Sequence, residues 1–175
     1  LDNSGQNTLV NNSMSGNTLN FGLDSTTEQG YIQDIDDTNL VNGKSIIYLY
    51  NQDRVVVDRN SNAGMVIAIN STGLVLENLN LTTNEYGVYF RNTRTSSLFN
   101  VTASGNLNGI TLDQGSSGNT IDDSFSSGNL INGLLVQSSN LNIITDSQFS
   151  NNGQNGIVIN SSNSNLLDGG TIINN

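Results

Sequence analysis

Residues 108–129, NGITLDQGSSGNTIDDSFSSGN, and residues 132–152, NGLLVQSSNLNIITDSQFSNN, are two copies of one pattern. Each copy opens with Asn-Gly, has apolar residues one and three positions after the glycine, and ends at a further Asn. Alternation with a period of two is typical of β-strands that bury one face. A repeat of this length predicts a solenoid, in which each unit stacks on the one before it.

The pattern extends through the chain as seven glycines spaced 21 to 24 residues apart: Gly22, Gly43, Gly64, Gly87, Gly109, Gly133 and Gly156. Twelve of the fourteen residues one and three positions after these glycines are apolar. We expect the glycines to lie at corners, where the absence of Cβ permits a positive φ. Asn-Gly, which precedes four of the apolar pairs, is also typical of β-hairpin turns, but hairpins would not maintain the spacing.

Two further apolar sets accompany the glycines. One lies eight residues before them and is expected to form a single interior file of Met14, Ile35, Val56, Leu79, Val101 and Phe125. The other lies about twelve residues before, at Val10, Val75, Ile121 and Ile144. Three inward patches per repeat predict three short strands per coil. The expected fold is all-β: a single-stranded, right-handed parallel β-helix of seven to eight coils.

A column of asparagines supports the stack. Asn84, Asn106, Asn129, Asn152 and Asn175 recur every 22 or 23 residues. Asn tolerates a left-handed backbone at turns, and stacked amides can form hydrogen bonds from one coil to the next. We therefore expect this column to mark one corner of the solenoid.

Composition excludes several classes of function. The chain has no Cys and no His, so it has neither disulfides nor thiolate or imidazole metal sites, and it cannot use Ser-His-Asp catalysis. Five basic residues against fifteen acidic ones, a net charge of −10, argue against nucleic-acid binding and favour attraction to cations. No apolar run approaches the ~20 residues of a membrane span.

The two quoted copies resemble the parallel β-helix repeats of NosD-type proteins, also called the CASH domain. The stretch YIQDIDDTNLVNGKSIIYLYNQDRVVVD, residues 31–58, is similar to a segment of the same proteins, many of which are archaeal and bacterial surface proteins. The resemblance covers essentially the whole chain and implies a location at the cell surface or outside the cell. It implies fold rather than activity, because this repeat serves enzymes, adhesins and scaffolds alike.

We expect residues 1–175 to form one β-helix domain, with irregular coils and a longer loop at 24–63, where Lys44 occupies an expected interior position. Because the chain starts and stops within the repeat and solenoids need polar caps, we expect a segment of a longer protein. The alternative is that partner chains cover the ends, as in end-to-end self-association.

The strand after each glycine offers a candidate ligand-binding face. Its outward positions are expected to be Val66/Ala68, Tyr89/Arg91, Thr111/Asp113, Leu135/Gln137 and Val158/Asn160. A ladder of Tyr89, Arg91, Asp113, Gln137 and Asn160 could stack on and hydrogen-bond to an extended sugar chain. The predicted partners are therefore glycans or other surface proteins.

Acidic residues suggest two other sites. Asp123 and Asp146 lie one coil apart with Asp168 near the next, and such a column could share a calcium ion, although solvated turn acids are the simpler interpretation. No other cofactor is implied. Glycoside hydrolysis or polysaccharide lysis would use Asp113 with Asp122 or Asp123 as acids and Arg91 as base.

The copper role of NosD itself is not expected here, because soft copper sites need clustered His, Cys or Met and the chain has only Met14 and Met65. The leading functional hypothesis is a non-catalytic surface module that presents a rigid, acidic, amide-rich face to glycans or surface proteins. A polysaccharide lyase or glycoside hydrolase is the first alternative. A purely structural spacer or lattice element is the second.

Overall fold

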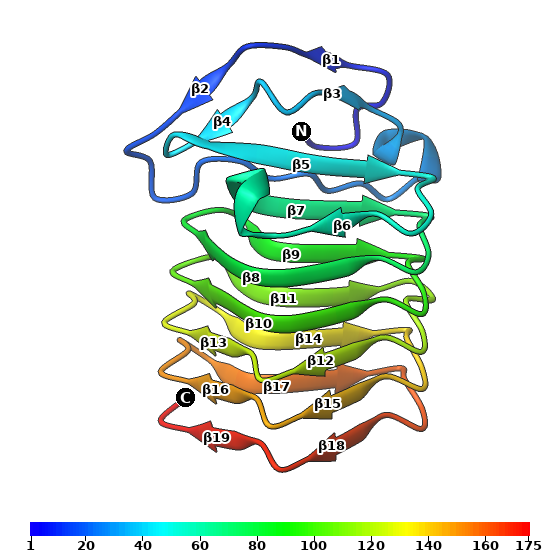
Figure 1. The fold of residues 1–175 in the computed structure, drawn as a ribbon, viewed down its shortest axis with the longest axis vertical. Helices are drawn as coiled ribbons and strands as arrows, with labels where there is room; N and C mark the ends of the chain where they lie inside the picture. Colours follow the sequence, from blue (N-terminus) through cyan, green and yellow to red (C-terminus); the bar gives the residue numbers. More distant parts are fainter.

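The computed structural model describes residues 1–175 as a stack of parallel coils, a β-solenoid of about seven turns (Figure 1). One side is a sheet of eight strands in the order β17-β14-β11-β9-β7-β5-β4-β2. These strands are β2 (Ser13–Met14), β4 (Leu40–Val41), β5 (Lys44–Tyr50), β7 (Ala63–Ile69), β9 (Tyr86–Arg91), β11 (Asn108–Asp113), β14 (Asn132–Gln137) and β17 (Asn155–Asn160). All neighbours from β5 to β17 pair in parallel, as predicted.

The other wall is a sheet of nine strands that bends along its length. It comprises β6 (Val56–Val57), β8 (Val75–Thr82), β10 (Ser97–Ser104), β12 (Thr120–Asp122), β13 (Phe125–Ser127), β15 (Ile143–Thr145), β16 (Gln148–Ser150), β18 (Leu166–Asp168) and β19 (Thr171–Ile173). The later coils have three strands, as predicted. The central coils have two, because β8 and β10 continue through the bend and β10 pairs with both β12 and β13.

The N-terminal end is built differently. β1 (Thr8–Leu9) pairs with β3 (Asp34–Ile35), and β2 pairs with β4, both in parallel. β4 then reverses into β5 as an antiparallel hairpin through Asn42 and Gly43, both with positive φ (50° and 79°). The hairpin interpretation of Asn-Gly, which the repeat spacing argued against, is thus correct at this one pair. Lys44 is half-buried beside the hairpin and donates a hydrogen bond to the Asn80 carbonyl, so its expected place in the core interior is wrong.

The core is a file of apolar residues that the coils bring into register. Leu76, Leu98, Ile121 and Ile144 align on one wall, so Leu76 and not Val75 is the interior residue of its coil. The expected six-residue file is wrong: Leu79 and Val101 pair, but Val56 pairs with Val75 and Phe125 with Thr102. Val56 and Phe125 are exposed, because each lies one position away from the inward-facing residue next to it.

The asparagine column lies inside the corners as a continuous hydrogen-bonded ladder. Each column residue after Asn84 accepts, on its side-chain oxygen, the backbone N–H of the column residue one coil earlier, at 3.0 to 3.1 Å. Their φ angles are negative, contrary to expectation, and the left-handed residue is the one before, for example Gly105 or Asn151. Asn119, Asn142 and Asn165 form a second such ladder at another corner.

The glycines at the second position of β9, β11, β14 and β17 do not have positive φ either. A Cβ on Gly109 would lie 1.8 Å from Ser126 Oγ and 2.7 Å from the Gly133 carbonyl oxygen. Glycine is required here because the ladder amides and the next coil approach the backbone closely, rather than for its conformational freedom.

Candidate functional site

The outer surface of β9, β11, β14 and β17, which we call the ladder face, carries two columns of side chains. The parallel register places Tyr89, Thr111, Leu135 and Val158 in one column, and Arg91, Asp113, Gln137 and Asn160 in the other. Five predicted ligand-binding residues therefore lie on one continuous face. Adjacent strands of a sheet lie about 4.8 Å apart, which sets the repeat of this face.

The expected continuation of the face into β7 is wrong by one residue. Val66 and Ala68 pair with Val88 and Phe90 and belong to the interior core, while Ile67 and Ile69 precede Tyr89 and Arg91 on the outer side. Every residue of β7 is apolar or Gly and is buried, because both faces of this strand are covered. The alternation that identifies the inward face elsewhere is consequently absent here.

The chain's own segment 19–33, which we call the strap, covers the end of the ladder face nearest β7, which we call its upper part. Its Phe21, Leu23 and Tyr31 form a second apolar cluster with outward residues such as Ile67 and Tyr89. The strap also hydrogen-bonds to the turn before β9, from Asn20 N–H to the Thr83 carbonyl and from Glu85 N–H to the Phe21 carbonyl, both 2.9 Å. Tyr89 and Arg91 are therefore buried, at 3% and 8% exposure.

Arg91 is the centre of a charged network beneath the strap. Its guanidinium contacts an Asp113 carboxylate oxygen at 2.9 Å and Glu28, in the strap helix η1 (Glu28–Tyr31), at 2.6 Å. The same guanidinium stacks over the Tyr31 ring, 4.4 Å from its centre. Burial by itself would lower the pKa of Arg91, but the hydrogen bond to Glu28 and the neighbouring Tyr89 and Tyr31 raise it above its ordinary value, so the guanidinium remains protonated.

Tyrosines complete the cluster. The Tyr89 ring stacks on Tyr86 with ring centres 4.6 Å apart, and its hydroxyl donates to Asp113 at 3.0 Å. Burial, followed by the nearby Asp113 carboxylate, raises the pKa of Tyr89 far above its usual 10.0. Burial likewise raises the pKa values of Tyr31, Tyr48 and Tyr86. The strap therefore packs against neutral tyrosine side chains and against one arginine, Arg91, whose charge is balanced by Asp113 and Glu28.

The lower part of the ladder face is open. Leu135, Gln137 and Val158 are half-buried and Asn160 is exposed. Beside them the asparagines that open β11, β14 and β17 form a third amide ladder, with the Asn132 amide donating to Asn108 and the Asn155 amide to Asn132, both at 2.9 Å. Asn108 and Asn132 are buried, so the amides of this face that can hydrogen-bond hydroxyl groups are those of Gln137, Asn155 and Asn160, while Leu135 and Val158 can pack against the apolar faces of a bound chain.

The acidic residues do not converge. Asp123 and Asp146 both have left-handed backbones at one bend, but Asp168 pairs with Thr145, which in turn pairs with Asp122, so Asp168 lies one position away from the column of Asp123 and Asp146. Gly169 occupies the next position of that column, its backbone against Asp146. The structure contains no cluster of three or more acidic side chains arranged to hold a metal ion.

The residues of the enzymatic alternative are also separated. Asp113 lies on β11 of the eight-stranded sheet, whereas Asp122 lies on β12 of the other sheet and accepts a hydrogen bond from Thr145 at 2.8 Å. Asp123 is exposed at the bend after β12. Arg91, with its raised pKa, is shifted in the wrong direction for a general base.

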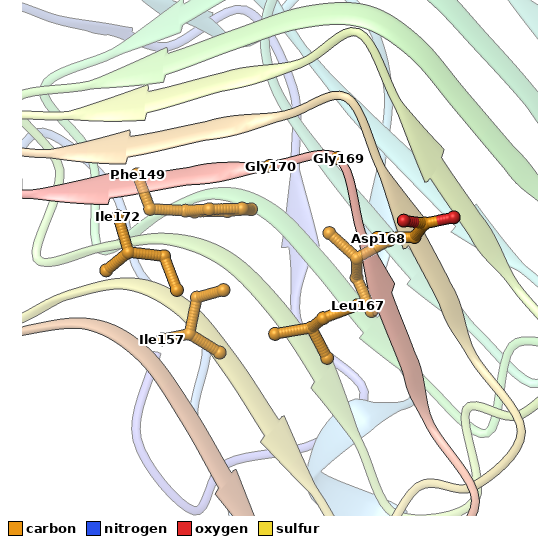
Figure 2. Close-up of a pocket in the computed structure, with 8 residues that line it drawn as sticks. Phe149, Ile157, Leu167, Asp168, Gly169, Gly170 and Ile172 are labelled. Carbon is orange, nitrogen blue, oxygen red and sulfur yellow. The ribbon is translucent and has the colours of Figure 1, made fainter.

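The C-terminal end of the solenoid has an apolar hollow of about 150 Å³ (Figure 2). Phe149, Ile157, Leu167 and Ile172 point into it, and the Asp168 carboxylate points away. These are interior positions of the last coils, and Leu167 and Ile172 are 40% and 55% exposed because no further coil covers them.

Stacked parallel coils, internal amide ladders and a flat outer strip define a β-solenoid repeat protein. Residues 32–175 match the family described as periplasmic copper-binding protein (NosD), and the chain belongs to that family. A periplasmic family is consistent with a module placed outside the cytoplasm. No curated protein and no solved structure matches the chain.

Copper does not fit the residues present. The chain has no His or Cys, Met65 is completely buried in the apolar cluster beneath the strap, and Met14 packs against the same cluster. Soft copper sites require several accessible thioether, thiolate or imidazole donors.

The structure also contains no helix with the length and hydrophobicity needed to cross a membrane.

The strap was missed at the sequence level. Glu28, Tyr31 and Tyr86 lie in the Arg91 cluster, yet none was a candidate site residue. The available signal was the aromatic content of residues 19–33 in a stretch where the repeat fails: Phe21 and Tyr31 have no place in the coil pattern, and so needed some other surface to bury them.

Proposed function

We propose that this NosD-family chain is a non-catalytic module of the cell surface, and that it binds an extended glycan along the open lower part of the ladder face. The observation that carries the proposal is the strip formed by Leu135, Gln137, Val158 and Asn160 beside the Asn108–Asn132–Asn155 amide ladder. Its residues repeat at the strand spacing, and the parallel pairing of β11, β14 and β17 sets their backbone positions before any ligand arrives. Preorganisation of this kind reduces the entropic cost of binding.

Asp113 marks the upper limit of this strip. Its carboxylate is held by Arg91 and Tyr89, and those two residues are buried under the strap. Tyr89 and Arg91 therefore contribute to the proposed site by fixing Asp113 rather than by touching the glycan. The direct contacts would come from Gln137 and Asn160.

The test is binding of the wild-type chain to a glycan array of cell-envelope polysaccharides, followed by affinity measurement for each positive glycan. The double variant Gln137→Ala/Asn160→Ala should lose most of the binding while keeping its thermal midpoint. The matched control is Gln148→Ala/Asn163→Ala, which removes two amides away from the strip and should bind normally. A blank array, or equal losses in both double variants, would refute the proposal.

A further inference from the structure

A polar hollow of about 200 Å³ lies where the β4–β5 hairpin, η2 (Arg59–Ser61) and strand β8 meet, and Lys44 and Ala63, at the starts of β5 and β7, form part of its lining. Its polar lining consists of Lys44, Arg59, Asn62, Asn78 and Asn80. No acidic residue lines it. In a chain with fifteen acidic residues and five basic ones, this is an unusual local concentration of positive charge.

The two basic side chains are not neutralised within the chain. Arg54 is paired with Asp53, and Arg91 with Asp113 and Glu28, but neither Lys44 nor Arg59 forms an ion pair. The Lys44 ammonium donates one hydrogen bond, to the Asn80 carbonyl at 2.9 Å, and an ammonium has three protons to donate. Two N–H bonds of Lys44 and the whole Arg59 guanidinium therefore remain available.

The hollow is held in shape by three segments that are far apart in the sequence. Lys44 follows the Asn42–Gly43 turn directly, and its bond to Asn80 fixes the hairpin against β8. Asp58 caps η2 by accepting the Asn60 N–H at 2.9 Å, which sets the position of Arg59. Asn62, with a left-handed backbone, donates its amide to the Gly43 carbonyl at 3.3 Å and so joins η2 to the hairpin.

We propose that this hollow binds a single oxyanion group, the carboxylate or sulfate ester of an acidic saccharide. Lys44 and Arg59 would supply charge-assisted hydrogen bonds, which are the stronger ones available to an anion. The amide side chains of Asn62, Asn78 and Asn80 would meet the neighbouring sugar hydroxyls. The net charge of −10 opposes densely charged polyanions, so a saccharide with isolated charges is the class that fits. The inference stands independently of the ladder face.

The test is a titration of the chain with sodium glucuronate and, separately, sodium sulfate, followed by backbone amide NMR, with sodium chloride at equal ionic strength as reference. We expect saturable shifts confined to residues 42–45, 59–62 and 78–80. The double variant Lys44→Gln/Arg59→Gln should weaken binding about tenfold or more, as expected for the loss of two charged donors. Arg54→Gln/Arg94→Gln removes the same charge elsewhere and should change the affinity less than about twofold.

Lys44→Gln could disturb the hairpin, so Arg59→Gln is measured alone. Arg59 is exposed and makes no side-chain bond within the chain, so this variant should fold normally and still bind several-fold more weakly. The inference is overturned if neither anion gives saturable shifts beyond those of chloride. It is equally overturned if the shifts spread over the whole surface, or if the two double variants lose the same affinity.

Discussion

The backbone N–H of Asn106 donates to the side-chain oxygen of Asn129, 3.0 Å away and one coil further along the solenoid. Asn129 in turn donates its amide to the Ala103 carbonyl and to Ser126. Both residues are almost completely buried, so each bond satisfies a group that water cannot reach. One amide side chain thus connects two coils and completes the turn of its own coil.

Substitution of Asn129 by Ala should therefore destabilise the protein by about 1–3 kcal/mol, because it leaves the Asn106 N–H buried without a partner. Urea unfolding measures the loss. Asn163→Ala, at an exposed turn, is the matched control and should change stability by less than about 0.5 kcal/mol. Equal effects of the two substitutions would show that the ladder contributes nothing to stability.

The two carboxylates that hold Arg91 should differ in importance. The Asp113 side chain is 15% exposed and the Glu28 side chain 67%. Asp113→Asn should cost several kcal/mol, about 3 by analogy with other buried pairs, because it leaves Arg91 under the strap with one solvated partner. Glu28→Gln should cost at most about 1 kcal/mol, and that cost should shrink in high salt. Unfolding at low and high salt concentration separates the two cases, and a reversed order would contradict the assignment.

Glu85 should destabilise the protein at neutral pH. Burial, with the charge of Asp24 as a second cause, raises the pKa of Glu85 above its ordinary 4.5 in the folded state. A carboxyl group with a raised folded-state pKa favours folding below its unfolded pKa and loses that contribution as pH rises. Glu85→Gln should therefore raise the thermal midpoint at pH 7 and have little effect at pH 4. A lower midpoint at pH 7 would show that the charged form is favoured.

The tyrosines with raised pKa values, Tyr31 in the strap and Tyr48, Tyr86 and Tyr89 outside it, predict a loss of stability in alkali. The pKa values of Tyr31, Tyr48, Tyr86 and Tyr89 are all raised by burial. Their contribution is complete below the ordinary pKa of 10.0 and is lost as the pH rises above it, because only the unfolded chain can ionise them there. Phenolate absorbance should appear together with unfolding for these groups. Tyr89→Phe should reduce the cooperative part of that signal, and ionisation of four tyrosines in the folded state would contradict the prediction.

Gly109 should not tolerate a side chain. Its added Cβ would overlap Ser126 Oγ at 1.8 Å, so Gly109→Ala should be strongly destabilising, by more than about 3 kcal/mol, or prevent folding. Gly128 is the contrasting case, since it has a positive φ of 62° with open space around it. Asn151 has the same conformation one coil later, so Gly128→Asn should be nearly neutral. Circular dichroism and thermal melting distinguish the two outcomes.

The repeat could be predicted because the coils from β9 to β17 are nearly identical in length and have apolar residues one and three positions after each glycine. In that region the in-line order of Arg91, Asp113, Gln137 and Asn160 follows from the spacing of the glycines alone. The prediction failed at β7, where Val66 and Ile67 are both buried and alternation carries no information about direction. It also failed at Asn42–Gly43, where the same dipeptide that opens later coils makes a hairpin instead.

The strap could not be predicted from the repeat, because its contacts join residues that no period relates. Glu28 and Arg91 are 63 positions apart, and Tyr31 and Tyr89 are 58 apart. Whether a solenoid face is exposed depends on the segments that pack over it as well as on the residues of the face itself. For that reason Tyr89 and Arg91 are of residue types common in binding sites, but in the structure they are buried.

The hairpin between β4 and β5 determines where a further coil could be inserted into the solenoid. Because the hairpin reverses the chain, β2 and β4 run antiparallel to β5 and to the strands stacked after it. A duplicated coil inserted there would lie beside strands that run in the opposite direction. Duplication between β9 and β17 adds one more parallel rung with its amides already aligned.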